Sequence, residues 1–302
     1  MTDDLSCSDG AIIEEEGHAR RCCHQTRYLP SQDIFYGESM IRLSKRLECV
    51  IDLVPAGRPV LDVGCDHAFT SIALVERGIC PYCVASDVRP GPLLAAEKNI
   101  RQAFLAEKIR TVLADGIPKN IGGIFHELMS GKNGSSDGAD GTGSAGCLKD
   151  ESEENQAPGA AAVITGMGGS LIVRILEDAG PCLDNFDALV LSPQSEPDKV
   201  RRCLPALHFT INDERMVKED GKYYTMILCE RGEGKTLSKK EALYGPILTG
   251  NRDPVLHEYL LKQREVLSGI REELGKHGKD GSPRYAEVSE LLEVTDEALQ
   301  DY

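Results

Sequence analysis

The sequence predicts an α/β protein, a doubly wound and mainly parallel sheet with helices on both faces, followed by a C-terminal α-helical hairpin. Two observations lead to this fold class. Between residues 59 and 208, short apolar runs of strand length alternate with segments whose apolar residues have helical spacing. Near the C-terminus, two long segments carry leucine and valine at helical spacing, and a turn rich in Gly, Lys and Asp joins them. This second pattern is typical of a short antiparallel coiled coil.

The elements follow in chain order from these patterns and from the Gly and Pro residues between them. Pro55-Ala56-Gly57 ends the first expected helix, and Gly78 is placed as the C-cap of the second. We expect helices at 44–54, 69–78, 93–105, 170–179 and 196–207, and strands at 59–64, 82–88, 109–116, 161–169 and 187–194. An Asp-Gly turn at 220–221 predicts a β-hairpin over 209–230 at the edge of the sheet. The two C-terminal helices are expected at 253–274 and 284–302.

Charge is distributed unevenly along the 302 residues, which carry a net charge of −15. Residues 1–40 hold 3 basic and 8 acidic side chains, and residues 126–162 hold 2 and 7. Both segments have few large apolar side chains, so we expect 1–40 to be a disordered extension and 126–162 a mobile low-complexity insertion. We also expect residues 1–39 to be dispensable or to arise from an upstream start codon. Residues 41–125 carry 11 basic and 9 acidic side chains, so the overall charge does not exclude a nucleic-acid substrate.

Cysteine usage indicates a reducing compartment. The 11 cysteines are odd in number and have no framework spacing. The sequence also lacks the basic segment followed by an apolar stretch that would mark an export signal. Cys22-Cys23-His24 lacks a second ligand pair, and Cys80-Pro81-Tyr82-Cys83 precedes a strand rather than following one, against a redox role. No apolar run approaches the roughly 18 residues of a membrane helix. We therefore expect a cytoplasmic protein with no metal and no membrane contact.

Polar and glycine residues at the ends of the expected strands carry the chemistry, because ligands of such sheets lie beyond the carboxyl ends of the strands. Asp62 suits a cationic group such as an ammonium or sulfonium, and Gly64 permits a close backbone approach. An acid at the end of the second strand, here Asp87, accepts hydrogen bonds from ribose hydroxyls. Each residue alone also fits a helix cap or a turn. In series, the residues indicate an S-adenosylmethionine site: Asp62, Gly64, Asp87, Asp115, Gly116, Gly166, Met167, Gly168 and Gln194.

Several classes of protein remain open on these residues. A class I methyltransferase could act on RNA, a small molecule or another protein. A non-catalytic nucleotide-binding module could use the helical hairpin to recruit a partner. A nicotinamide enzyme is disfavoured, because only Gly64 stands where a dinucleotide site needs three glycines.

Eight short motifs between residues 43 and 248 narrow the choice of protein class: LSKRL, LDVGCDHA, GPLLAAEKN, DG at 115–116, GMGG, LSPQ, EDGKYY and YGPIL. Together they resemble the bacterial tRNA (adenine-22-N1)-methyltransferase family, the TrmK type. The resemblance implies a Rossmann-like S-adenosylmethionine-binding catalytic domain at 41–235 and a helical domain at 236–302 that helps hold tRNA. It also implies methyl transfer from S-adenosyl-L-methionine to N1 of adenine 22.

The resemblance also suggests roles for individual residues. Asp62, Gly64, Asp66 and His67 would shape the methionine end of the cofactor site, with Arg46 on the cofactor carboxylate. Asp87 and Val88 would hold the ribose side, and Asp115 with Gly116 the adenine ring. Gly166, Met167 and Gly168 would lie between the cofactor and the target base.

The expected chemistry needs little from the protein beyond alignment, because N1 of adenine is itself nucleophilic at neutral pH. The catalytic candidates are Asp66, Met167 and Gln194, with the Gln194 amide or the 166–168 backbone on the N6 amine of the target base. The candidates for tRNA contact are Arg42, Lys45, Arg46, Lys199, Arg201, Arg202 and the basic residues of the C-terminal hairpin. We expect a monomer.

Overall fold

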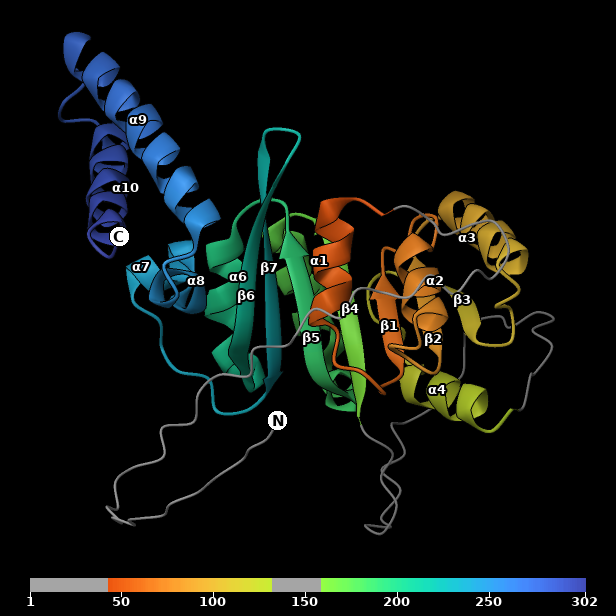
Figure 1. The fold of residues 1–302 in the computed structure, drawn as a ribbon. Coiled ribbons are helices and arrows are strands. Elements are labelled where there is room, and N and C mark those ends of the chain that lie inside the picture. The colour runs from red at the N-terminus through yellow and green to blue at the C-terminus, as the bar shows by residue number, and fades with distance from the viewer. Residues whose placement is uncertain (1–42, 132–158) are drawn as a thin grey trace, which may run out of the picture. The chain divides into compact units, whose positions relative to one another are not determined.

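The sheet has the predicted doubly wound topology. The computed structural model describes residues 43–131 and 159–302, and within them the sheet has seven strands in the order β3-β2-β1-β4-β5-β7-β6 (Figure 1). The strands are β1 (Val60–Val63), β2 (Cys83–Asp87), β3 (Ile109–Leu113), β4 (Ala160–Met167), β5 (Phe186–Pro193), β6 (Phe209–Glu219) and β7 (Lys222–Arg231). β1 to β5 pair in parallel, and β7 pairs antiparallel with both β5 and β6. The strand order reverses between β1 and β4, and this switch point places a ligand crevice there.

Helices cover both faces of the sheet because its central strands alternate between two buried sides. Leu61 and Val84 pack with α4 (Ile121–Met129), α5 (Gly169–Ala179) and α6 (Pro197–Cys203). Val60 and Ala85 point the other way and pack with α1 (Lys45–Leu53), α2 (Phe69–Glu76) and α3 (Pro90–Gln102). Short 3-10 helices follow α5 and α6 at Gly180–Asn185 and Leu204–Leu207. The β1 residues Val60–Val63 are all buried, as expected for a strand covered on both faces.

The C-terminal part begins after the β6–β7 hairpin. The hairpin turns at Asp220 (φ 49°) and Gly221 (φ 74°), the left-handed pair that a tight two-residue turn requires. Four helices follow within the described residues: α7 (Lys239–Tyr244), α8 (Pro246–Gly250), α9 (Pro254–Lys276) and α10 (Pro283–Leu299). Leu256 and Leu260 at the start of α9 pack with Ala298 at the end of α10, and Leu267 packs with Val288. The two long helices therefore form the predicted antiparallel hairpin.

Several predicted boundaries were wrong. Residues 126–129 belong to α4 and residues 160–162 to β4, so the low-complexity insertion cannot extend over the whole of 126–162. The rest of that segment (132–158) and the extension at 1–40 lie outside the described residues. The predicted helix 196–207 divides into α6 and a 3-10 turn, because Pro205 interrupts it. α4, α7 and α8 were not predicted at all.

Residues Ile41–Tyr302 form one compact unit. The division into a catalytic domain at 41–235 and a helical domain at 236–302 stays a prediction, because the two parts are not separate compact units. In the part of the chain that the structure describes, no helix is long and apolar enough to cross a membrane.

Candidate active site

A cavity of about 690 Å³ lies at the carboxyl ends of β1, β2 and β4, where the strand order reverses. Twelve of the thirteen residues predicted for the site line it: Arg46, Asp62, Gly64, Asp66, His67, Asp87, Val88, Asp115, Gly116, Gly166, Met167 and Gln194. The exception is Gly168, whose Cβ position would lie 3.0 Å from Ser195 Oγ. Gly168 is instead the N-cap residue of α5, and its carbonyl accepts the first helical hydrogen bonds from Leu171 and Ile172.

Asp62 is a buried carboxylate on the wall of this cavity. Its side chain accepts a 2.6 Å hydrogen bond from Ser71 Oγ in α2, and the residue is 2% exposed. Within the described residues it forms no ion pair. Burial raises the pKa of Asp62 to about 6, against the lowering effect of the Ser71 bond, and nearby Asp87 adds to the rise. A buried acid without a cationic partner suits a cationic ligand, because such a ligand offsets the desolvation of the charged form.

The loop after β1 is held in one conformation by backbone geometry. The amides of Gly64 and Cys65 donate to the Ser86 carbonyl at 2.8 and 2.9 Å, which ties β1 to β2 at the cavity floor. Gly64, Asp66 and Ala68 all have positive φ, at 74°, 49° and 60°. This strained turn directs Asp66 and His67 toward the cavity rim, where both are exposed.

Acids and glycines at the next two strand ends complete the adjoining wall. Asp87 ends β2 and is buried, and its Oδ1 accepts a 2.9 Å hydrogen bond from the Arg89 amide. Within the described residues, no hydrogen bond or ion pair occupies its Oδ2. The next residue, Val88, is 57% exposed and presents an apolar side chain to the cavity. Beyond β3, Asp115 lies 3.8 Å from Arg174 of α5, and both side chains are exposed.

The GMGG and LSPQ motifs meet on the opposite side. The backbone amide of Gln194 donates to the Met167 carbonyl at 2.8 Å, and this bond joins the ends of β4 and β5. The Met167 side chain lies over Gly64, because a Cβ built on Gly64 would come within 2.4 Å of Met167 Cε. Gly166 has φ 77°, with open space around its Cβ position, so its backbone faces the cavity without a side chain.

Two further motifs meet at the mouth of the cavity. Arg46 of LSKRL lies over the ring of Tyr224 of EDGKYY, 5.1 Å from its centroid, and the Lys45 amide donates to Glu219 of the same motif at 2.6 Å. This stacking holds the guanidinium of a cavity residue in place.

The structure overturns one of the predicted tRNA contacts. Arg201 is 1% exposed and forms a buried ion pair with Glu214, so it cannot reach a nucleic acid. Lys199 pairs with Glu196 and donates to Ser170, whereas Lys45 and Arg202 are exposed. Arg42 lies outside the described residues.

Sequence patterns missed several residues of the cavity. Phe69 begins α2 and stacks on His67 with 5.5 Å between ring centroids. Leu171, Arg174 and Ile175 lie on one face of α5, and Thr165 precedes the GMGG motif. The spacing of i, i+3 and i+4 between Leu171, Arg174 and Ile175, on a helix that follows a ligand-binding loop, was the sequence feature that could have predicted these three residues.

The strand order with its antiparallel seventh strand, and the acids at the ends of β1 and β2, define the class as a class I, Rossmann-like methyltransferase. A methyltransferase-domain family model matches residues 43–123, and the model of TrmK, tRNA (adenine(22)-N(1))-methyltransferase, matches residues 148–297. The chain belongs to the TrmK family, and is a tRNA (adenine-N1)-methyltransferase.

Individual relatives agree with this assignment. The chain is 25% identical over 267 residues to the tRNA (adenine(22)-N(1))-methyltransferase of Bacillus subtilis, covering 86% of this chain and 98% of that one. It is 30% identical to Sp1610 of Streptococcus pneumoniae, a candidate tRNA (m1A22) methyltransferase, with a TM-score of 0.68 over 85% of this chain and 100% of that chain. The structure of Sp1610 in complex with S-adenosyl-L-methionine is 31% identical with a TM-score of 0.65, at the same coverage.

Proposed function

We propose that this chain transfers a methyl group from S-adenosyl-L-methionine to N1 of adenine 22 in tRNA. The observation that carries the proposal is the cavity at the switch point, with the carboxyl groups of Asp62 and Asp87 on its wall, in a chain of the TrmK family. The relative from Bacillus subtilis is named for this reaction, and the relative from Streptococcus pneumoniae binds this cofactor.

The residues of the cavity fit S-adenosylmethionine. Asp62 is buried and lacks an ion-pair partner among the described residues, so it suits the ammonium of the methionine end. Arg46, held over Tyr224, suits the carboxylate of the same end. When bound, the cofactor supplies an activated methyl group on a sulfonium. Asp66 and His67 are exposed residues of the cavity lining and would lie at this same end.

The nucleoside end has matching partners. Asp87 has its Oδ2 available to accept from the ribose hydroxyls, as an acid at the end of the second strand commonly does. Val88 presents an apolar side chain on which a flat base can pack. Asp115 and Gly116 line the cavity, and the Asp115 carboxylate would accept a hydrogen bond from the adenine amino group.

The protein's part in the chemistry is to align and desolvate the target base. N1 belongs to the Watson–Crick edge, so the target adenine must be unpaired or flipped out before it can react. Met167 and the Gly166 backbone form a wall on the side of β4, and the side chain of Gln194, which lines the cavity beside them, would bond the N6 amine. Asp66 would orient the methionine end of the cofactor or stabilise the positive charge on the product. No general base is needed to start the reaction.

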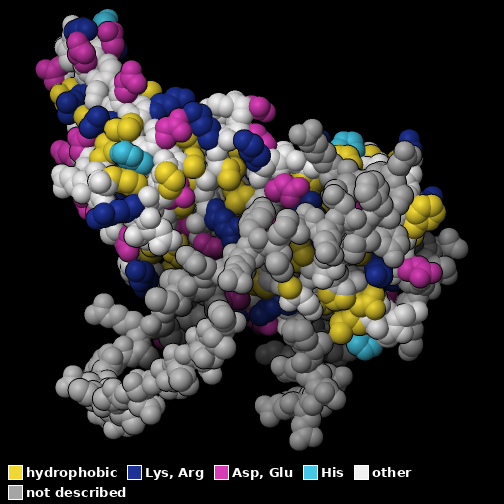
Figure 2. Space-filling model, in the orientation of Figure 1, with side chains coloured by type: hydrophobic (Ala, Val, Ile, Leu, Met, Phe, Trp, Pro, Cys, Tyr) yellow, Lys and Arg dark blue, Asp and Glu magenta, His cyan; other side chains and the backbone are white. Residues whose placement is uncertain are grey.

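Contact with tRNA is proposed to rest on local basic side chains. Lys262, Arg264 and Arg271 on α9 are exposed. In Figure 2, Lys and Arg side chains lie interspersed with Asp and Glu over α9 and α10. Binding through such a surface depends on phosphate neutralisation and falls as salt rises. A cytoplasmic location, a coiled-coil character of α9–α10 and a monomeric state are parts of the same proposal.

The test is methyl transfer from labelled S-adenosylmethionine to total bacterial tRNA, followed by transcripts of one accepted tRNA. Label is expected in the wild-type transcript and absent when adenine 22 is replaced by guanosine. Label that persists in the replaced transcript contradicts the site of methylation. Label in protein or small-molecule fractions, with none in tRNA, contradicts the substrate class.

A further inference from the structure

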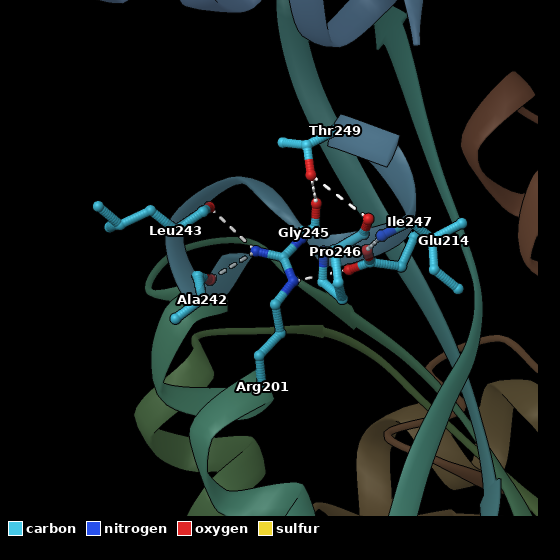
Figure 3. A network of polar contacts seen from close by, with 8 residues as sticks. All are labelled: Arg201, Glu214, Ala242, Leu243, Gly245, Pro246, Ile247 and Thr249. Atoms are coloured by element: carbon cyan, nitrogen blue, oxygen red, sulfur yellow. Dashed lines mark hydrogen bonds and ion pairs between the residues drawn. The ribbon is translucent and has the colours of Figure 1, made fainter. Parts of the chain in front are cut away.

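A buried ion pair joins the catalytic sheet to the C-terminal helices. Arg201 of α6 donates from Nε to Glu214 Oε1 of β6 at 2.7 Å, and the two side chains are 1% and 0% exposed (Figure 3). A buried ion pair is weak evidence for stability, because desolvation offsets most of its attraction. Its hydrogen bonds, however, specify geometry, so the groups that it contacts indicate what the pair does.

Both partners contact the backbone of the α7–α8 joint. Arg201 Nη1 donates to the carbonyls of Ala242 and Leu243 near the end of α7, at 2.9 Å each. Glu214 Oε2 accepts from the Ile247 amide near the start of α8 at 3.0 Å (Figure 3). Each charge thus meets the helix end of complementary polarity. Together the two side chains hold the end of one helix and the beginning of the next.

Gly245 lets the joint approach the ion pair closely. Its φ is 91°, and a Cβ built on it would lie 2.4 Å from Glu214 Oε2. Thr249 Oγ1 donates to the Gly245 carbonyl at 2.7 Å and closes the turn from the other side (Figure 3). The YGPIL motif (244–248) is therefore shaped to fit this pair.

The joint in turn carries the long helical hairpin. Tyr244 of α7 shares a 2.6 Å hydrogen bond with Thr295 of α10, and both are buried. Lys240 of α7 pairs with Asp301 at 2.9 Å. The Tyr302 hydroxyl donates to the carbonyl of Asp253, the N-cap of α9, at 2.9 Å. The joint that Arg201 and Glu214 hold is therefore one of two attachments that set the direction of α9 and α10 relative to the sheet, the other being the ion pair of Lys218 on β6 with Glu258 on α9.

The other end of this connection is the active site. α6 begins three residues after Gln194. This residue lines the cavity, and its backbone amide donates to the Met167 carbonyl. The loop between them packs on the start of α5, where the Gly169 amide donates to the Ser195 carbonyl at 2.8 Å. One short helix thus links the cavity wall to the helical hairpin.

We infer that Arg201 and Glu214 are positioning residues for the methyl transfer. Through the α7–α8 joint, and together with the direct contact of α9 with β6, they keep α9–α10 in the orientation at which a tRNA bound there brings its target base into the cavity. This inference rests on the proposed function. Since a misplacement of about 1 Å can lower a rate a hundredfold, loss of the pair should lower kcat while the S-adenosylmethionine site stays intact.

The experiment replaces the pair by apolar residues of similar size, Arg201→Met with Glu214→Leu, in the full chain. We measure kcat at saturating tRNA, together with the Kd and stoichiometry of S-adenosylmethionine by calorimetry. The expected result is a kcat lowered roughly tenfold to a hundredfold, with unchanged cofactor Kd and stoichiometry. Arg110→Met is the control, since it breaks a more exposed ion pair, that of β3 with Glu127 on α4, and it should keep the wild-type kcat.

The stoichiometry of cofactor binding separates loss of positioning from simple destabilisation. Destabilisation lowers the number of folded cofactor sites, and kcat falls in the same proportion. An unchanged kcat, or a kcat that falls only in that proportion, overturns the inference. If the double variant does not fold, Tyr244→Phe removes one bond between α7 and α10, the Tyr244–Thr295 hydrogen bond, and Thr295 keeps its bond to the Leu291 carbonyl. A several-fold lower kcat is expected there, and an unchanged one overturns the inference. A wild-type protein that methylates no tRNA refutes the proposed function itself, and the inference with it.

Discussion

Ser71 Oγ donates a 2.6 Å hydrogen bond to Asp62 Oδ2, and both residues are buried between β1 and α2. The bond holds a carboxylate that has no ion-pair partner within the described residues on the wall of the cavity. Burial makes the charged form of this group costly, so its pKa is raised to about 6. A cationic ligand reverses that cost. Binding and stability should therefore respond in opposite directions to changes at Asp62.

Asp62→Asn should weaken S-adenosylmethionine binding and stabilise the free protein. Asn retains an acceptor for Ser71 but removes the buried charge. A pKa raised from 3.8 to about 6 corresponds to roughly 3 kcal/mol of cost when the group is ionised. We expect the free energy of unfolding at pH 8 to rise by about 1–3 kcal/mol and the cofactor Kd to rise at least about tenfold. Calorimetry and urea unfolding measure the two effects. The exposed Asp52→Asn should change neither, and tight binding by the Asp62 variant would contradict the assignment.

The pH dependence follows from the same group. In the folded protein the raised pKa favours the protonated form, so Asp62 is neutral in both states only well below pH 3.8, its ordinary pKa. Between pH 4 and 6 the carboxyl ionises in the unfolded chain while it stays largely protonated in the folded protein. The contribution of Asp62 to the free energy of unfolding therefore falls as pH rises through 6. Binding needs the charged form, so cofactor affinity should rise with pH by about tenfold between pH 5 and 7. Calorimetry in buffers of different ionisation enthalpy should detect proton release near pH 5.5, and none with Asp62→Asn.

Gly64→Ala should weaken cofactor binding more than it destabilises the fold. The added Cβ would meet Met167 Cε at 2.4 Å and push that side chain within the cavity, while φ at 74° adds backbone strain. Gly57→Ala is a matched control, since its φ is 84° with open space around the Cβ position. Both variants should lose about 1 kcal/mol of stability. Only Gly64→Ala should change the cofactor Kd, and equal Kd values for the two would refute a role for the contact with Met167.

Gln194→Ala should lower turnover and leave cofactor binding unchanged. Its backbone bond to Met167 does not depend on the side chain, so the cavity keeps its shape. Loss of one hydrogen bond to the N6 amine is worth roughly 1–2 kcal/mol, a fall in kcat of about fivefold to thirtyfold. Single-turnover methylation of the tRNA transcript measures it. A changed cofactor Kd with normal turnover would place the side chain on the cofactor instead.

Neutralising the acids of residues 132–158 should strengthen tRNA binding. Six acidic side chains lie there, and Asn or Gln at each position removes their repulsion of phosphate. The tRNA Kd should fall several-fold at 50 mM salt and change little at 200 mM, since the Debye length shortens. A variant with the same residues in scrambled order is the control. An identical Kd at 50 mM would show that this charge lies too far from bound tRNA to matter.

Local sequence patterns predicted most of the fold but missed its short helices. Residues 121–129 contain Gly122-Gly123, and glycine inside a helix costs about 1 kcal/mol, so the pattern favours a loop. Packing of Ile121, Ile124 and Phe125 on the sheet outweighs that cost in α4. The helices α7 and α8 are 6 and 5 residues long, too short to show a period.

Two neighbouring arginines show most clearly that sequence patterns do not predict which side chain of a helix is buried. Arg201 and Arg202 have the same chemistry in the sequence, and both were predicted to contact RNA. Successive residues of a helix point about 100° apart, so α6 buries one against Glu214 and exposes the other. Glu214, 13 residues away, is what makes the buried position tolerable.

The sequence by itself determined the α/β class, the acids and glycines at the strand ends, and the resemblance to a tRNA methyltransferase family. These features depend on local periodicity and on motifs at consecutive strand ends, which the chain order preserves. The tertiary structure alone decided that Gly168 caps α5 rather than lining the cavity, that Phe69 and Arg174 line it, and that Arg201 holds the α7–α8 joint. Each of these depends on which side chain faces which neighbour, and that is set by packing between segments distant in sequence.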